Sequence, residues 1–192
     1  EIIPPFWGGS IDQIFSLVEE LMKFEPPFID LTSRSAEEYY QDDGSGNLVQ
    51  HIRRKRPGTI GISAAIKNKF NVETVPHLLC SGFSKEETED ALIELNYLGI
   101  KNVLALRGDD LRKDRNEINS KISNGYASDL VKQIKNMNEG KYLEPLIDPT
   151  KSDFCVGVSG YPEKHFEAID FKTDIKYLKE KVENGADYIV TP

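Results

Sequence analysis

The stretch NVLALRGDD, residues 102–110, ends a run of small and branched apolar residues with an arginine, a glycine and two aspartates. Three interpretations fit this change: a turn, an exposed Arg-Gly-Asp adhesion loop, or one wall of an active site. An adhesion loop belongs to a secreted protein, and the sequence shows no basic segment followed by an apolar one that would direct secretion. Arg107 could pair with Asp109 or Asp110 in a turn, or bind an anionic ligand in an active site.

Polar residues follow the other apolar runs as well. If these runs are parallel strands, their carboxyl ends meet at one rim, where the sequence places Glu1, Thr32, His77, Arg107 with Asp109, Tyr161 with His165, and Thr191. Such a set can bind and protonate a ligand, because it combines carboxylates, imidazoles, a guanidinium and hydroxyls. The sequence therefore predicts a ligand site at this rim.

Each of these residues also has a simpler interpretation. Glu1 ends an apolar strand, where a carboxylate is suited to general acid catalysis, but it could equally be a solvated side chain. His77, inside VPHLLC, could be a histidine of the core. Tyr161 and His165 are four residues apart around a proline, a spacing that suits an aromatic ligand or a capped turn.

The elements that must position these residues alternate between two periodicities. Helical spacing predicts helices at 10–24, 58–70, 84–100, 126–138 and 172–186. Ser84 and Glu87 form a capping-box pattern, and Gly99 and Gly185 end their helices. Short apolar runs predict strands at 28–32, 75–80, 102–106, 154–160 and 187–191, and residues 1–3 end a first strand.

This alternation of six strands and five helices, with strands apolar on both faces, predicts a parallel sheet covered by helices. A doubly wound sheet and a (β/α)₈ barrel both fit the pattern. Because no strand precedes G-x-G-x-x-G or a P-loop, we predict an α/β fold of the (β/α)₈ TIM-barrel class. We expect residues 1–192 to form one domain that is cut at both ends and holds only the first six strands.

Two long segments that follow strands stand out, 33–57 and 108–125. Both lie where the loops of a barrel carry function. The first contains HIRRKRPG, for which we derive no role, and a solvated basic loop is the simplest interpretation.

The composition restricts the class of protein. The chain has 192 residues, of which 39% are hydrophobic and 29% charged, enough to bury a core. Its formal net charge of −8 argues against a nucleic-acid or anionic membrane surface. Cys80 and Cys155 lack CxxC spacing and histidine partners, so we expect no metal site and two buried, reduced thiols in a cytoplasmic protein.

Six ordered motifs carry a resemblance to a known family: EIIPP, PHLLC, ALRGD, YASDLV, YPEKHFEA and ENGADYIVT. Together they resemble the methylenetetrahydrofolate reductase family, in its bacterial-type, FAD-dependent form, over essentially the whole chain. The resemblance implies an FAD-binding (β/α)₈ barrel of one-carbon and methionine metabolism, commonly a homo-oligomer. NADH or NADPH would reduce FAD and leave, and methylenetetrahydrofolate would then take the hydride to give methyltetrahydrofolate.

The resemblance also implies roles for individual residues. Glu1 would be the general acid that opens the folate ring, and Asp109 would lie between flavin and pterin and tune the flavin potential. The positions that match the FAD-holding residues of the family are Thr32, His77, Arg107, Gly108, Asp109, Ala127, Tyr161, His165, Ala168, Asp174 and Lys181. Arg107 and Lys181 would be the cationic partners of the pyrophosphate.

The chain also departs from the family pattern. SRSAEEYY follows Thr32, where many relatives place an aromatic residue and then small residues against FAD. Pro192 follows Thr191, where the family usually has a folate-binding glutamine. These departures leave two alternatives beside the reductase: a truncated, non-catalytic flavin-binding relative, or another barrel flavoprotein such as a proline-dehydrogenase-like oxidoreductase. The sequence does not decide between NADH and NADPH.

Overall fold

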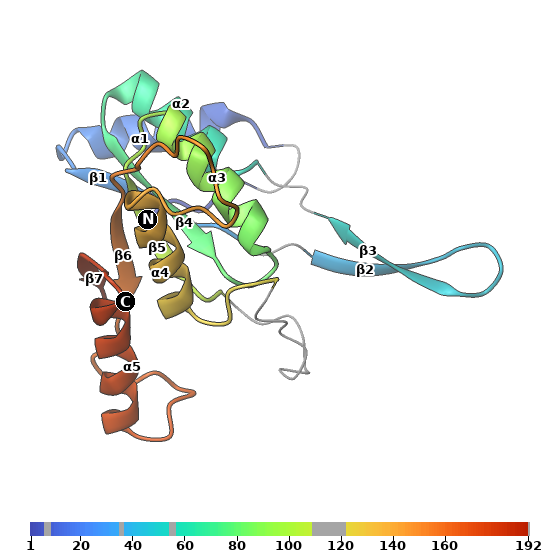
Figure 1. Ribbon diagram of the computed structural model, residues 1–192. Coiled ribbons are helices and arrows are strands. Elements are labelled where there is room, and N and C mark those ends of the chain that lie inside the picture. Colours follow the sequence, from blue (N-terminus) through green and yellow to red (C-terminus); the bar gives the residue numbers. More distant parts are fainter. Residues whose placement is uncertain (6–8, 35–36, 54–56, 109–121, 192) are drawn as a thin grey trace.

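The computed structural model describes residues 1–5, 9–34, 37–53, 57–108 and 122–191 (Figure 1). The helices are α1 (Ile11–Met22), α2 (Thr59–Phe70), α3 (Lys85–Tyr97), α4 (Ala127–Asn138) and α5 (Phe171–Glu183). The strands are β1 (Phe28–Leu31), β2 (Glu37–Asp42), β3 (Leu48–Arg53), β4 (Glu73–Leu79), β5 (Asn102–Leu106), β6 (Cys155–Ser159) and β7 (Tyr188–Val190).

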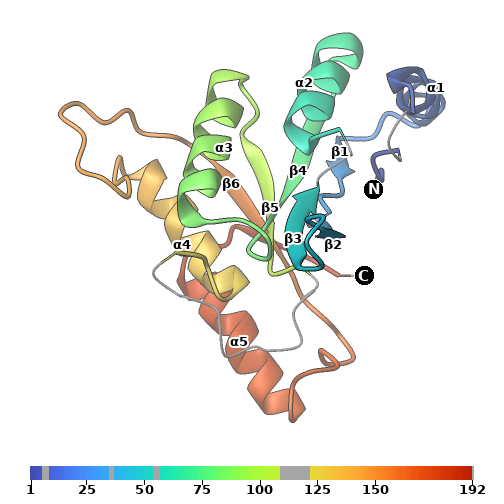
Figure 2. The same ribbon diagram turned by 90° about the vertical axis from the view of Figure 1, so that its right-hand side faces the viewer.

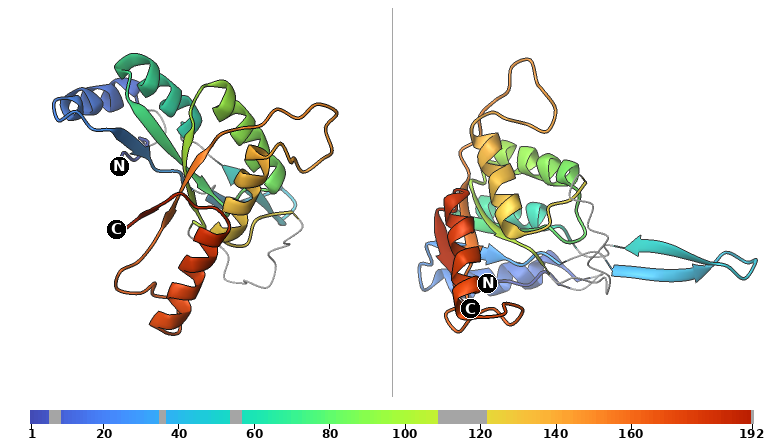
Figure 3. Two further views of the ribbon diagram at one scale, coloured as in Figure 1. Left: turned by 60° about the vertical axis from the view of Figure 1, so that its left-hand side comes forward. Right: turned by 60° about the horizontal axis from the view of Figure 1, so that its bottom comes forward.

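The main sheet is parallel, and its strands follow the order β1-β4-β5-β6-β7. Ile2 adds a parallel bridge to Leu31, so the start of the chain lies beside β1. β2 and β3 form a separate two-stranded sheet, and the strands of the main sheet lie side by side in the order in which they occur along the chain. A doubly wound sheet differs, because its strand order reverses at one point. The sheet curls, and the helices lie along its convex side (Figures 2 and 3). The fold is α/β with a curled parallel sheet.

The core lies between the sheet and the helices. In the larger cluster, Leu78, Val103 and Val156 of the central strands pack with buried side chains of α3 and α4. In the smaller cluster, Ile2 and Leu31 pack with buried side chains of α1 and α2. Because side chains alternate along a strand, the intervening residues of each strand face the concave side of the sheet. That side carries the polar residues described below.

The predicted helix ends are confirmed at two positions. The backbone N–H of Glu87 donates to Ser84 Oγ at 3.1 Å, and the backbone N–H of Ser84 donates to Glu87 Oε2 at 2.8 Å, which completes the capping box of α3. Gly185 follows α5 with φ +109°, a conformation that side chains rarely adopt. None of the described helices has the length and apolar character needed to cross a membrane.

The expected loop at 33–57 contains secondary structure that we did not predict. β2 and β3 form an antiparallel hairpin, which extends away from the main sheet (Figure 1). Tyr39 stacks on His51 with the ring centroids 5.3 Å apart. In the turn between the strands, the backbone N–H of Gly44 donates to Asp42 Oδ1 at 2.7 Å. Hydrogen bonds from Ser45 and Asn47 lower the pKa of Asp43 to about 2. The expectation of a plain loop is wrong, because cross-strand pairs stabilise this segment without an apolar face for sequence patterns to detect.

Candidate cofactor site

The predicted site residues lie mainly at the carboxyl ends of the parallel strands. Thr32 follows β1, Arg107 and Gly108 follow β5, and Tyr161 follows β6. His165 and Ala168 lie in the loop that leads to α5, Asp174 and Lys181 lie in α5, and Ala127 begins α4. Asp109 and Pro192 lie outside the described residues, as do most residues of the segment at 108–125.

Glu1 and Thr32 form a hydrogen-bonded pair. Thr32 Oγ1 donates to Glu1 Oε1 at 2.6 Å, and the backbone N–H of Thr32 donates to the carbonyl of Ile2 at 2.9 Å. The Glu1 side chain is exposed. The hydrogen bond from Thr32 therefore orients the carboxyl of the expected acid beside the end of β1.

His77 lies on the concave side of the sheet, where it is only 5% exposed. Its Nε2 is 3.8 Å from Asp30 Oδ1 of β1, and neither atom has a hydrogen-bond partner in the described part of the chain. Asp30 is not among the site residues predicted from the sequence. The signal was present in FIDLT, where one carboxylate interrupts an apolar strand.

Arg107 pairs with a residue that the sequence did not suggest. Its Nη1 donates to Glu167 Oε2 at 2.7 Å, and both side chains are largely buried. The expected partners, Asp109 and Asp110, lie outside the described residues. Glu167 is fixed in turn, because its backbone N–H donates to His165 Nδ1 at 3.2 Å. The loop after β6 thus covers the end of β5.

The same loop is held by a set of local contacts. The rings of Tyr161 and His165 meet edge to face with centroids 4.8 Å apart. Lys164 has φ +78°, and its ammonium donates to the carbonyl of Ala168 at 2.6 Å. Asp174 Oδ2 accepts from the backbone N–H of His165 at 2.9 Å. The structure therefore confirms the capped turn at Tyr161 and His165, and binding of an aromatic ligand by these two rings stays a prediction.

Lys181 brings a second cation to this region. Its Nζ donates to the carbonyl of Ser159, the last residue of β6, at 2.9 Å. Burial lowers the pKa of the Lys181 ammonium; Asp174 opposes this change, and Arg107 adds to it. The positive charges of Arg107 and Lys181 therefore act on each other at this rim.

Gly108 adopts φ +81° directly after Arg107. A β-carbon there would lie 3.4 Å from the β-carbon of Ser81 and 3.5 Å from the side chain of Leu79. The position therefore favours glycine for its backbone conformation.

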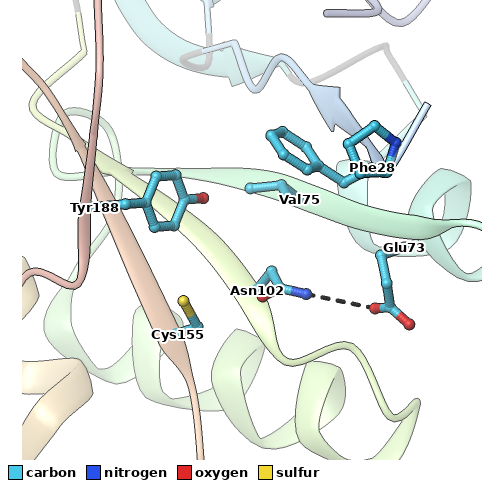
Figure 4. Close-up of a pocket in the computed structure, with 7 residues that line it drawn as sticks. Phe28, Glu73, Val75, Asn102, Cys155 and Tyr188 are labelled. Atoms are coloured by element: carbon cyan, nitrogen blue, oxygen red, sulfur yellow. Dashed lines mark hydrogen bonds between the residues drawn. The ribbon is translucent and has the colours of Figure 1, made fainter.

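A cavity of about 330 Å³ lies at the opposite, amino-terminal end of the strands (Figure 4). Its lining includes Phe28, Glu73, Val75, Asn102, Cys155 and Tyr188. Burial raises the pKa of the Cys80 thiol to about 12, as expected for an inert cysteine, but Cys155 is only half-buried because it faces this cavity. No cluster of potential metal ligands occurs among the described residues.

The structure thus defines an α/β protein with a curled parallel sheet, in which cations, aromatic rings and a carboxylate gather at the carboxyl ends of the strands. The sequence model of the methylenetetrahydrofolate reductase family matches residues 1–192. The chain belongs to this family.

Individual relatives agree with this match. The chain is 32% identical to methylenetetrahydrofolate reductase 1 of Schizosaccharomyces pombe over 192 residues, all of this chain and 27% of the relative. It is 37% identical to 5,10-methylenetetrahydrofolate reductase of Buchnera aphidicola over 193 residues, all of this chain and 53% of the relative. For methylenetetrahydrofolate reductase (NADH) 1 of Arabidopsis thaliana, the identity is 30% over 200 residues, all of this chain and 29% of the relative. The chain spans between a quarter and about half of the length of these relatives.

Proposed function

We propose that this chain carries out the flavin-dependent reduction of 5,10-methylenetetrahydrofolate to 5-methyltetrahydrofolate with NADH or NADPH. The observation that carries the proposal is the convergence of the residues matched to the family's flavin contacts. They are scattered from Thr32 to Lys181, yet nearly all of the described ones lie at or near one end of the sheet. The family match over residues 1–192 supports the same activity.

The residues present fit an FAD molecule. Arg107 and Lys181 would hold the pyrophosphate, since Arg107 follows β5 and the ammonium of Lys181 lies at the last residue of β6. His77 would contact the flavin from the concave side of the sheet, where its side chain is buried. Gly108 would allow close approach of the backbone. Bound FAD would supply hydride transfer between the nicotinamide and the folate.

The remaining roles belong to the two carboxylates. Glu1 would protonate the folate amine so that its five-membered ring opens, and the Thr32 hydroxyl would orient the acid for that transfer. Asp109, next to Gly108 in the sequence, would lie beside the flavin, disfavour its reduced anionic form and so ease hydride donation.

We further propose that the curled sheet, together with the start of the chain, forms the first six strands of a (β/α)₈ barrel. Residues 1–192 would then belong to a single FAD-binding barrel domain. The consecutive strand order and the bridge from Ile2 to Leu31 support this architecture. The protein would be a homo-oligomer, as the resemblance implies, and it would be cytoplasmic, as the cysteine usage suggests.

The test is the visible absorption spectrum of the purified chain, followed by anaerobic addition of NADH or, separately, NADPH. We expect a flavin spectrum that bleaches and returns on addition of methylenetetrahydrofolate. Bleaching without return would support a flavoprotein that does not act on folate, such as a proline-dehydrogenase-like enzyme. A flavin spectrum that neither nucleotide bleaches would support a non-catalytic relative, and a chain that never takes up FAD would overturn the proposal.

A further inference from the structure

We propose that Asp30 is a positioning residue, which fixes the tautomer and orientation of His77 through a hydrogen bond from His77 Nε2–H to its carboxylate. This assignment extends the proposed function, because His77 is one of the proposed flavin contacts. Nothing in the family resemblance described above assigns a role to Asp30.

The strand register brings the two residues together. Asp30 pairs with Val75 and Leu31 pairs with Pro76 in the parallel ladder between β1 and β4. Because side chains alternate, Asp30 and His77 lie on the concave face of adjacent strands. Their side chains are 18% and 6% exposed, and Asp30 Oδ1 and His77 Nε2 are 3.8 Å apart.

Both atoms need a partner, and they face each other across 3.8 Å. Asp30 Oδ1 and His77 Nε2 are buried and make no hydrogen bond within the described residues. Leaving buried polar atoms unpaired is unfavourable, and hydrogen bonds around a ligand site are often long before the ligand binds. A small side-chain rotation closes this gap.

The chemistry of the pair determines which proton His77 carries. A neutral imidazole has one donor nitrogen and one acceptor nitrogen, whereas an ionised carboxylate only accepts. Asp30 therefore selects the tautomer with the proton on Nε2 and leaves Nδ1 as an acceptor. A ligand group facing Nδ1 would then have to be a donor.

β1 connects this pair to the proposed acid. Asp30 and Thr32 are two residues apart and so point to the same face, and Thr32 Oγ1 donates to Glu1 Oε1 at 2.6 Å. The carbonyl of Asp30 also accepts from the backbone N–H of Ile2 at 2.8 Å. One strand thus positions both the acid and a proposed flavin contact.

A third polar group competes for Asp30. The Tyr188 hydroxyl is buried and has no hydrogen-bond partner in the described chain. Burial and, next, the charge of Asp30 raise the pKa of Tyr188. A hydrogen bond from Tyr188 to Asp30 would leave His77 without a fixed tautomer, so the experiment must separate the two possible donors.

The experiment is proton NMR of the ¹⁵N-histidine-labelled chain without flavin. The chain has three histidines, and variants His51→Gln and His165→Gln assign their signals by elimination. We expect a slowly exchanging, downfield Nε2–H resonance for His77 that is lost in Asp30→Leu, is retained in Asp30→Asn, whose amide oxygen still accepts, and persists in Tyr188→Phe. Ser63→Ala is the matched control, because Ser63 Oγ is another buried hydroxyl that has no hydrogen-bond partner among the described residues, and it lies on α2.

A His77 resonance that survives in Asp30→Leu, or that is lost in Tyr188→Phe but not in Asp30→Leu, would overturn the proposal. So would a wild-type His77 that carries its proton on Nδ1. FAD titration of the same variants adds a second measurement: Asp30→Leu should weaken binding about tenfold, as for one hydrogen bond, and Asp30→Asn should recover most of it. If the wild-type chain binds no FAD, the proposed function fails, but the NMR result still decides the role of Asp30.

Discussion

Arg107 and Glu167 are 60 residues apart in the sequence, and Arg107 Nη1 donates to Glu167 Oε2 at 2.7 Å. The pair joins the end of β5 to the loop after β6. The Glu167 carboxylate thus already binds the guanidinium of Arg107, which we propose to bind the pyrophosphate of FAD. An anionic ligand at this rim must therefore either displace Glu167 or share Arg107 with it, and the planar guanidinium has enough donors to serve both.

Two substitutions separate these roles of Arg107. Arg107→Ala and Glu167→Gln both break the ion pair, so each should lower the free energy of unfolding by about 1–2 kcal/mol. Arg107→Ala should in addition weaken FAD binding by about tenfold to hundredfold, through loss of a charged hydrogen bond. Urea unfolding and FAD titration measure the two effects. Equal losses of FAD affinity in both variants would mean that Arg107 acts only by holding the loop.

Glu1→Gln tests the proposed acid. The amide cannot donate a proton to the folate amine, so turnover with methylenetetrahydrofolate should fall by about 10²–10⁴-fold. Reduction of the flavin by NADH does not require this proton, so its rate should stay near that of the wild type. Stopped-flow absorbance of each half-reaction gives the answer. If both half-reactions slow to the same extent, Glu1 supports the fold and does not act as the proton donor.

Lys181 should make FAD binding and stability respond to alkaline pH. Burial lowers its pKa below the usual 10.5, so in the window between the lowered pKa and 10.5 the folded chain binds fewer protons than the unfolded chain. The contribution of Lys181 to stability should therefore rise with pH through this window, while FAD affinity falls as the cation is lost. The buried Cys80 thiol changes stability in the opposite direction at alkaline pH, so the contribution of Lys181 is the difference between the wild type and Lys181→Met. Lys181→Met should also remove the fall in FAD affinity, and Lys179→Met, on the exposed side of α5, should behave like the wild type. Urea unfolding and FAD titration between about pH 8 and 11 check the prediction.

The sequence was enough to predict the elements whose signals are local. Ser84 with Glu87 and the terminal Gly185 mark helix ends through contacts within a few residues, and the buried strands are apolar on both faces. The site was predictable only as a rim of strand ends. Its internal pairs join residues 31 and 60 positions apart, as in Glu1 with Thr32 and Arg107 with Glu167, and local patterns carry no information on such partners. The β2–β3 hairpin was missed for a similar reason, since its stability rests on cross-strand pairs.

Gly157 tests the packing inside the curl of the sheet. A β-carbon at Gly157 would lie 2.4 Å from the ring of Tyr188 on the neighbouring strand, so the ring must move. Gly157→Ala should therefore lower the free energy of unfolding by about 1–3 kcal/mol through overpacking. Gly61→Ala is the control, because no neighbouring atom lies within 4 Å of its β-carbon and alanine favours the helix by about 0.5–1 kcal/mol. Urea unfolding should also show that Tyr188→Leu partly restores the stability of Gly157→Ala, since the smaller side chain frees the space that the methyl group needs. If Gly157→Ala proves as stable as the wild type, the ring of Tyr188 does not occupy the concave side of the sheet.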